Sequence, residues 1–477
     1  MIREIGLDEI EPLAVGSAFL GTGGGGDPYL GSLLCREAIR RCGPVPLIEV
    51  ASLSDSDAVF VAAAMGAPTV MIEKLFSLED QDRAVRALEK YLAREATAII
   101  SAEIGGCNSM MPVAYAAMRG LPIVDGDGMG RAFPQLQMTS FNVNGVAAAP
   151  MTLADEHGNV VLFEAVDGKK AEDLARPVVA VMGAAGCMSC YPMTGTQARK
   201  ATVPSTLSAA VEIGRAVMGA SFAELPPIER LLKVLRRLPL YQQAQCLFEG
   251  KISSVERTTR DGWVFGACEV SSLEGSSKAV VAFQNENLTA EIDGAVHCMV
   301  PDLITIVDSE TAHAIPTERL AYGQRVSVIA CAAPPQLVTP EALALMGPQA
   351  FGIEREFQSL GELAGANNDD MRQMKIGCNK FSTVTAIGLA MMSAIWANEA
   401  VAQEASDDKG GIKDIVVTAQ RRTEKLQQVP IQVAAFSSDK IEDAGITSTQ
   451  DFVSLVPNVS LDESFTYLNS FVVVRGV

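Results

Sequence analysis

The stretch TAIISAEIGGCNSMMPVAYAAMRGLPIVDGD, residues 97–127, decides the fold expected for the first part of this chain. Thr97–Ser101 is a short apolar run that predicts a buried strand, and Leu121–Val124 predicts another strand that ends at Asp125. Between them, Met111–Met118 predicts a helix. A strand, a helix and a second strand in this order are typical of an α/β fold with a parallel sheet.

The same alternation extends toward the N-terminus. Ala58–Ala64 (AVFVAAA) predicts a further buried strand, and Gln81–Arg94 has helical spacing with charged faces. We therefore expect residues 1–165 to form an α/β domain in which helices cover a mostly parallel sheet.

The pattern changes in residues 166–360, which we expect to form a β-rich, barrel-like second domain. Residues 196–240 are predicted to be helical, and residues 250–345 to be β-rich. Short apolar runs separated by Gly, Ser and Asp turns are typical of a small barrel or sandwich. These runs are Lys251–Glu256, Trp263–Val270, Lys278–Gln284, Leu288–Glu291, Leu303–Val307 and Gln324–Ala330.

Charge and cysteine usage exclude some classes of protein. A formal net charge of -19 over 477 residues argues against nucleic-acid binding. Met1–Pro12 is charged and lacks the apolar segment of a signal peptide. The cysteines are scattered, mostly singly, which is typical of reduced, buried thiols. We therefore expect residues 1–360 to be cytoplasmic.

One pair of cysteines is close in sequence, Cys187 and Cys190 in a C-x-x-C arrangement. The pattern is compatible with buried structural thiols, with a redox pair and with half of a zinc site. No second pair follows at zinc spacing, and the chain has only three histidines, so a multi-histidine metal site is not expected.

A run of glycines follows the apolar segment Ala14–Leu20. Consecutive glycines let the backbone approach a ligand and turn its N–H groups toward an anion, although the same run also fits a structural turn. It lacks the pattern of a nucleotide-binding loop, so no nucleotide cofactor is predicted. The candidate substrate-binding residues here are Gly23, Gly24, Gly25, Gly26 and Asp27.

Polar loops also follow the predicted strands, where open α/β sheets usually bind ligands. Glu103 and Asn108 follow one strand, and Asp125, Asp127 and Arg131 (DGDGMGR) follow the next. Two carboxylates beside an arginine suit acid–base catalysis, a cation site or an anion clamp, while a solvated Asp/Gly turn is the alternative.

Glu73 and Lys74 follow another apolar run. They are candidates to join the same cluster, and a surface ion pair is the alternative.

Seven motifs, in order, make residues 7–357 resemble the DUF917 family, also described as S-methyl-thiohydantoin desulfurase-like. The motifs are GTGGGGDPYLG (Gly21–Gly31), GAPTVMIEK (Gly66–Lys74), EIGGCNS (Glu103–Ser109), VDGDGMGRAFPQLQM (Val124–Met138), YPMTG (Tyr191–Gly195), FQNENL (Phe283–Leu288) and VPDLI (Val300–Ile304).

The resemblance implies an α/β N-terminal domain and a β-rich C-terminal domain. It implies a small cyclic amide or thioamide substrate and hydrolytic replacement of a ring C=S or C–S-methyl group by C=O. It also implies association with hydantoinase/oxoprolinase-type enzymes, and we expect a homo-oligomer. A non-catalytic accessory subunit of a hydantoinase is the alternative.

The loops suggest roles within such a reaction. Asp125 or Asp127 would activate water as a general base, and Arg131 with the Gly23–Gly26 amides would stabilise the developing anion. Glu103 and Asn108 would hydrogen-bond the N–H groups of the ring. A divalent metal held by Asp and Glu side chains is a further possibility.

The chain changes character after a small, polar stretch at residues 361–373, predicted to be a linker. Lys375 and Lys380 precede an apolar run, Phe381–Trp396, and Ala400–Ala402 supplies a small-residue cleavage pattern. Residues 374–402 therefore resemble a signal peptide at an internal position. A transmembrane helix is the alternative.

Residues 403–477 resemble the start of a TonB-dependent outer-membrane receptor. Ile412–Arg422 is similar to a TonB box, Leu426–Leu461 to the start of a plug domain, and Phe471–Val477 to a plug strand. No barrel strands follow, so this fragment is not expected to transport, and TonB contact is implied for it alone. The change of character after residues 361–373 has three possible explanations. These are an annotation or assembly join, a genomic rearrangement and a true fusion.

Overall fold

The computed structural model describes residues 2–66, 70, 74, 77–260, 263–365, 416–419, 422–425, 459–463 and 470–474. The chain divides into two compact units, Met1–Ile387 and Gly388–Val477. Within the described residues, no helix combines the length and the apolar character needed to cross a membrane.

The first unit begins with a mixed sheet. Among the described residues it has nine strands in the order β1-β2-β5-β4-β3-β8-β6-β7, with β9 paired to β5. The strands are β1 (Glu4–Ile5), β2 (Val45–Glu49), β3 (Ala58–Gly66), β4 (Ala98–Ile100), β5 (Ile123–Asp127), β6 (Met151–Ala154), β7 (Val160–Phe163), β8 (Ala185–Thr194) and β9 (Val203–Pro204).

The expectation of a mostly parallel sheet is wrong. Only the neighbouring pairs among β2, β5, β4 and β3 are parallel. β6 and β7 are joined by a short turn, which can connect only antiparallel strands, and β8 runs antiparallel to both β3 and β6. The predicted α/β class is confirmed, with a mixed sheet in place of a mostly parallel one.

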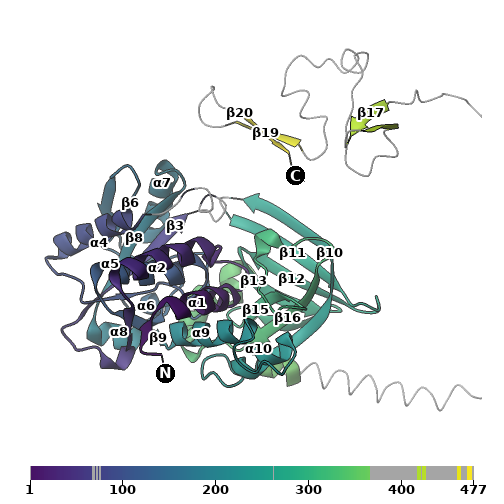
Figure 1. The fold of residues 1–477 in the computed structure, drawn as a ribbon, viewed down its shortest axis with the longest axis horizontal. Coiled ribbons are helices and arrows are strands. Elements are labelled where there is room, and N and C mark those ends of the chain that lie inside the picture. The colour runs from purple at the N-terminus through teal and green to yellow at the C-terminus, as the bar shows by residue number, and fades with distance from the viewer. Residues whose placement is uncertain are drawn as a thin grey trace, which may run out of the picture. The chain divides into compact units, whose positions relative to one another are not determined.

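Helices cover both faces of this sheet (Figure 1). Phe60 and Ala62 of β3 pack into one core cluster, whereas Val59, Val61 and Ala63 pack into another on the opposite face. A strand buried on both faces needs an almost continuous apolar sequence, as AVFVAAA has. The helices are α1 (Leu7–Leu20), α2 (Pro28–Cys42), α4 (Leu78–Leu92), α5 (Cys107–Arg119), α6 (Ser140–Val143), α7 (Gly168–Val181), α8 (Gly195–Ala201) and α9 (Thr206–Val217).

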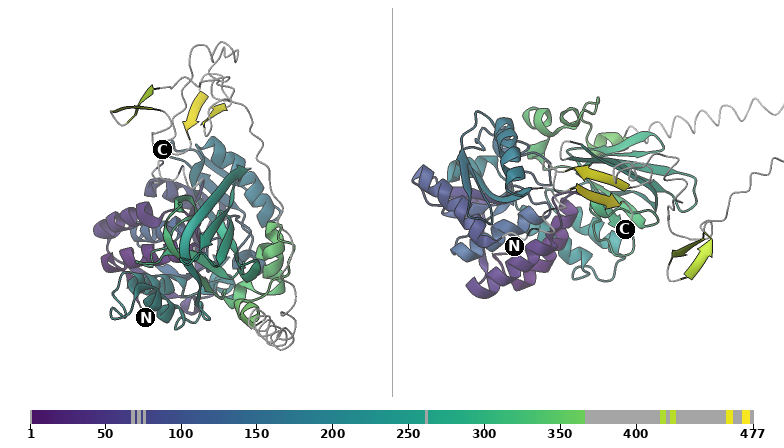
Figure 2. Two further views of the ribbon diagram at one scale, coloured as in Figure 1. Left: turned by 90° about the vertical axis from the view of Figure 1, so that its right-hand side faces the viewer. Right: turned by 90° about the horizontal axis from the view of Figure 1, so that it is seen from above.

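The second sheet is antiparallel throughout and strongly curled (Figure 2). Its described strands follow the order β14-β13-β12-β11-β10-β16-β15 and form half a barrel. All six predicted runs fall on strands of this sheet, but β10 extends six residues before and four residues after the predicted Lys251–Glu256, and β14 is not among the six. The strands are β10 (Gln245–Arg260), β11 (Trp263–Ser271), β12 (Lys278–Gln284), β13 (Glu286–Ile292), β14 (Ala295–Met299), β15 (Leu303–Asp308) and β16 (Arg325–Cys331).

The two sheets belong to one unit, and several elements join them. α10 (Pro227–Leu235) packs against α9, and α11 (Pro340–Met346) follows β16. Thr305 of β15 donates a hydrogen bond from Oγ1 to the carbonyl of Phe19 at the end of α1, at 2.9 Å. The first sheet also takes in β8 and β9, so the α/β part extends past residue 165.

Part of the predicted linker at 361–373 is described, and it is helical at 361–365. Leu363 is 5% exposed and packs with Val296 and Met299. The described parts of the second unit are two antiparallel strand pairs: β17 (Val416–Ala419) with β18 (Arg422–Lys425), and β19 (Val459–Glu463) with β20 (Ser470–Val474). The predicted signal segment 374–402 lies outside the described residues, as does most of the predicted plug.

Candidate functional site

A pocket of about 100 Å³ lies where loops of the first sheet meet the start of β13, and we call it the carboxyl pocket. Two buried carboxyl groups, Glu103 and Glu286, line it from the two sheets. The other lining residues used below are Gly25, Gly26, Asn108, Gln135, Arg176 and Trp263.

Glu103 follows β4, and its side chain is held by Asn108 in the first turn of α5. Asn108 donates from Nδ2 to Glu103 Oε1 at 2.7 Å and to the Ala64 carbonyl at 3.1 Å, while its Oδ1 accepts the Ala64 N–H at 2.8 Å. Burial raises the pKa of Glu103 to about 8, Asn108 opposes that rise, and the charges of Glu286 and Asp127 add to it. Glu103 is therefore protonated at neutral pH and can donate a proton.

Glu286 is the first residue of β13 and is 4% exposed. Burial raises its pKa to about 7, and the Arg131 charge and a backbone hydrogen bond from Gly25 work against the rise. Its Oε2 is buried and has no hydrogen-bond partner among the described residues. Buried polar atoms usually have a hydrogen-bond partner, so a molecule bound in the pocket would donate a hydrogen bond to this oxygen.

The glycine loop surrounds the Glu286 carboxyl. A Cβ on Gly24 would lie 2.1 Å from Glu286 Oε1, and one on Gly25 would lie 2.8 Å from the Gly105 carbonyl. Gly25 also has φ +77°, a conformation that favours glycine. Gly23 packs against Thr317, whose N–H donates to the Gly23 carbonyl at 2.8 Å. The glycine loop therefore packs closely around the protein's own Glu286 carboxyl group. Of its glycines, only Gly25 and Gly26 line the pocket.

Arg176 of α7 and Trp263 of β11 form another part of the wall. The Arg176 guanidinium carbon lies 4.6 Å from the centre of the Trp263 ring system. Arg176 also pairs with Glu172 and donates to the Pro134 carbonyl at 3.1 Å. An aromatic surface beside a fixed cation suits a flat, polar ring.

The structure thus brings together four of the predicted residues at this pocket: Glu103, Asn108, Gly25 and Gly26. Asp27 lies elsewhere, capping α2 by accepting the Tyr29 N–H at 2.9 Å and pairing with Arg319 at 2.6 Å. Gly23 and Gly24 support the loop without lining the pocket.

Asp127 is fully buried behind the Glu103 loop. Its Oδ2 accepts the N–H groups of Ile104, Met129 and Gly130 at 2.8, 3.0 and 2.8 Å, and burial raises its pKa to about 7. It does not line the carboxyl pocket. Its general-base role stays a prediction, and the geometry supports a different one: Asp127 fixes the loop that carries Glu103.

Asp125 is separated from this pocket as well. It accepts the Ser208 N–H at 3.1 Å and the Ser208 hydroxyl at 2.6 Å, both in the first turn of α9. A carboxylate at a helix N-terminus stabilises the helix, because it satisfies free N–H groups and complements the helix dipole. The side chain of Ser205, the N-cap residue of α9, forms no capping bond, so Asp125 takes over that function.

Arg131 is fully buried and uses its donors inside the protein. It bonds the carbonyls of Pro301, Asp302 and Asn287 at 3.2, 2.9 and 3.0 Å, and Thr22 Oγ1 at 2.8 Å. Burial lowers its pKa to about 10. Its predicted role at a substrate anion stays a prediction, while its contacts join the two sheets.

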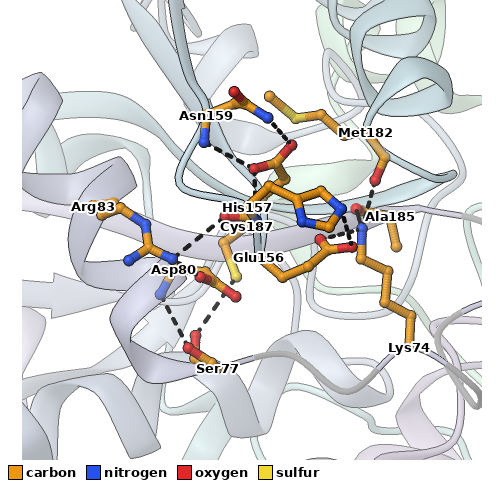
Figure 3. Close-up of polar contacts among 11 residues, drawn as sticks. Lys74, Ser77, Asp80, Arg83, Glu156, His157, Asn159, Met182, Ala185 and Cys187 are labelled. Carbon is orange, nitrogen blue, oxygen red and sulfur yellow. Dashed lines mark hydrogen bonds and ion pairs between the residues drawn. The ribbon is translucent and has the colours of Figure 1, made fainter.

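Lys74 lies in a separate polar cluster (Figure 3). Its ammonium group donates to the carbonyls of Met182 and Ala185 at 2.5 and 2.7 Å and pairs with Glu156 at 2.7 Å. It does not line the carboxyl pocket, and Glu73 lies outside the described residues.

The two C-x-x-C thiols belong to different apolar clusters. Cys187 packs with Cys107 and Met111, whereas Cys190 packs in the core on the other face of β8. Side chains three apart on a strand point to opposite faces, and burial raises both thiol pKa values. This arrangement fits the structural interpretation and not a redox or zinc pair.

Among the residues with described side chains, His, Cys, Asp and Glu form no group of three or more suited to a metal ion. Sequence reasoning missed Glu286, Arg176 and Trp263 as site residues. Glu286 lies within the FQNENL motif, so that motif was its only signal, and nothing in the sequence marked the other two.

The fold and the pocket define a protein with a mixed α/β sheet, a curled antiparallel sheet and a carboxyl-lined site between them. Sequence models of the S-Me-THD-like family match residues 8–165 (N-terminal domain) and 166–360 (C-terminal domain). The chain therefore belongs to the S-Me-THD-like family.

A crystal structure of a protein from Chromobacterium violaceum, from the Northeast Structural Genomics Consortium, has a similar fold, with a TM-score of 0.64 and 24% sequence identity. The similarity covers 75% of this chain and 100% of that one. No curated protein matches this chain significantly in sequence. The family match ends at residue 360, so the receptor-like nature of residues 374–477 stays a prediction.

Proposed function

We propose that residues 8–360 form a hydrolase for a small cyclic amide or thioamide, replacing a ring C=S or C–S-methyl group by C=O. Membership of the S-Me-THD-like family supports a hydantoinase-related function. The observation that carries the proposal is the pair of buried carboxyl groups, Glu103 and Glu286, with pKa values raised to about 8 and about 7 in one pocket. Two carboxyl groups with different proton affinities can act as acid and base near neutral pH.

In this proposal Glu286 is the base and Glu103 is the acid. Glu286 has the lower pKa and an unpartnered oxygen, so it takes a proton from water as the water oxygen bonds to the ring carbon. Glu103 protonates the thione sulfur. The C–S bond then breaks, the sulfur leaves as H₂S with the proton held by Glu286, and the new hydroxyl returns its proton to Glu103. Both carboxyl groups end as they began.

The volume and the other lining residues of the pocket suit a small cyclic substrate. A pocket of about 100 Å³ fits a small ring better than a larger ligand, for which pockets of roughly 300–1,000 Å³ are usual. Trp263 offers an aromatic surface for a planar ring, and Arg176 supplies a nearby positive charge for the developing anion.

The test is turnover by the purified chain of 2-thiohydantoin and its S-methyl derivative, followed by released sulfide or methanethiol. We expect kcat/KM to be bell-shaped in pH, with limbs near the pKa values of about 7 and about 8. The two limbs belong to the pair jointly, because the carboxyl groups interact. Glu286→Gln and Glu103→Gln should each lower kcat/KM by about 10²–10⁴-fold.

Glu291→Gln, on the same strand but outside the pocket lining, is the matched control and should retain wild-type turnover. No turnover by the purified chain, together with stimulation of an added hydantoinase, would favour the accessory-subunit alternative. Full activity of Glu286→Gln would remove Glu286 from the mechanism.

A further inference from the structure

We propose that a second cavity, between β5 and α9, binds a small organic cation with an apolar body, such as a primary alkylamine. This β5–α9 cavity has a volume of about 550 Å³. It shares no lining residue with the carboxyl pocket, among the residues that the structure describes. The site is therefore additional to the proposed hydrolase site.

The walls of the β5–α9 cavity are largely apolar, and its size falls in the range of small-molecule sites. Apolar side chains of this kind would hold the hydrocarbon part of a ligand by removing it from water. The apolar lining residues are Ile2, Pro204, Ala209, Leu238, Pro239 and Leu240.

Two carboxylates of the cavity lining, one exposed and one buried, stand side by side. Glu49 of β2 and Asp125 of β5 are register partners in neighbouring parallel strands. Like charges directly opposite each other in a sheet are destabilising, and the Glu49 charge raises the pKa of Asp125 in addition to the larger effect of burial. Within the described part of the chain, the Glu49 carboxylate has no hydrogen-bond or ion-pair partner. An ammonium group placed between them would relieve the repulsion.

A third carboxylate and one guanidinium complete the charged lining. Arg215 of α9 pairs with Glu212 at 3.0 Å and also with Glu9 at 3.0 Å, outside the lining. Its charge is therefore shared between two carboxylates. The lining holds Glu49, Asp125 and Glu212 against Arg215 alone, so the cavity complements a cation and not an anion.

Two positive side chains close to this part of the chain are directed elsewhere. The Lys233 ammonium and the Arg237 guanidinium lie over the ring of Phe222, at 4.1 and 4.6 Å from its centre, and Phe222 and Arg237 line a neighbouring hollow. A primary ammonium carries three N–H donors, and the hydroxyl groups of Ser205 and Ser208 line the same cavity as further acceptors. Apolar walls with an excess of carboxylates therefore select an alkylamine over an alkanol or an alkanoate of equal length.

The experiment is isothermal titration of the full chain with hexylamine, hexanol and hexanoate at fixed ionic strength. We expect saturable binding of hexylamine, at least tenfold weaker binding of hexanol, and no binding of hexanoate. Glu49→Gln should weaken hexylamine binding, because it removes one charge contact with the ammonium group. We expect Kd to rise by about tenfold, which corresponds to about 1.4 kcal/mol. Glu274→Gln, an exposed glutamate in the β11–β12 turn, is the matched control and should bind as the wild type does.

Leu240→Asn tests the apolar wall at a partly exposed position without adding charge, and should weaken hexylamine binding and leave methylammonium unchanged. Each variant is first checked for wild-type thermal unfolding, so that a loss of binding is not a loss of fold. Equal affinity for the amine and the alkanoate, or unchanged binding in Glu49→Gln, would overturn the proposal. Hexylamine binding that Glu286→Gln abolishes would place the ligand in the carboxyl pocket and would also overturn it.

Discussion

Asn108 donates a hydrogen bond to Glu103 at 2.7 Å while its own oxygen accepts the Ala64 N–H of β3 at 2.8 Å. The Asn108 amide therefore links Glu103, the acid of the proposed mechanism, to the backbone near the end of the buried strand β3. With both Nδ2 hydrogens engaged by Glu103 and the Ala64 carbonyl, Asn108 acts as a positioning residue rather than as a donor to substrate.

Asn108→Leu should shift the alkaline limb of the pH–rate profile upward. The hydrogen bond from Asn108 lowers the pKa of Glu103, so its loss raises that pKa further. The variant should also lose about 2–4 kcal/mol of stability, because buried groups of Ala64 and Glu103 lose their partners. Asn144→Leu, which loses a hydrogen bond to the Ser140 carbonyl, should leave the limb in place.

Asp127→Asn should move the same limb in the opposite direction. The negative charge of Asp127 raises the pKa of Glu103, so removing that charge lowers it. Measuring kcat and KM across pH separates this effect from loss of a base. If Asp127 were the general base, turnover would fall by about 10²–10⁴-fold at every pH.

The pH dependence of stability provides an independent check on the buried carboxyl pair. Both pKa values are raised from 4.5, to about 8 for Glu103 and about 7 for Glu286, so the folded protein binds more protons than the unfolded chain between those limits. Their contribution to stability therefore falls as pH rises from 4.5 to 8.

The double variant Glu103→Gln/Glu286→Gln removes this penalty. Urea unfolding should show it to be more stable than wild type at pH 8, with the difference shrinking toward pH 4.5. A difference that does not vary with pH would show that the two carboxyl groups titrate normally.

Arg131→Met should destabilise the protein by about 3–5 kcal/mol, because several buried acceptors lose their hydrogen-bond donor at once. The carbonyls of Asn287, Pro301 and Asp302 would lose their donor at the junction of the two sheets. Arg131→Lys should rescue only part of the loss, because an ammonium cannot reproduce the guanidinium fork.

Arg325→Met is the matched control for Arg131→Met in urea unfolding. Arg325 pairs with Glu310 at 3.6 Å at the surface, so its loss should change stability by less than about 0.5 kcal/mol. Equal effects of the two substitutions would contradict the joining role of Arg131.

The tryptic peptide Glu356–Arg372 crosses the change in sequence character after residue 360. We expect peptide mass spectrometry of the native source to find peptides from both flanks and not this one, because the predicted signal peptide at residues 374–402 would belong at an N-terminus. Its detection would show that both pieces are translated together.

Much of the fold could be predicted from local sequence. The run AVFVAAA predicts β3 because a strand covered on both faces needs apolar side chains at every position. The six strand-like runs of the second sheet are marked instead by the Gly, Ser and Asp turns that separate them. Strand direction could not be predicted in this way, because pairing between β8 and β3 depends on residues more than a hundred positions apart.

The candidate site, too, was predicted from the sequence only in part. The sequence by itself marked Glu103, Asn108 and the glycine loop, because polar groups after buried strands gather at one sheet edge. Only the tertiary structure decided that Glu286, from a strand of the other sheet, shares their pocket, while Asp125 and Asp127, two residues apart, serve a helix cap and a loop anchor. Local patterns report which side chains are available, but the proton affinity and partners of a buried carboxyl group depend on neighbours that packing alone brings together.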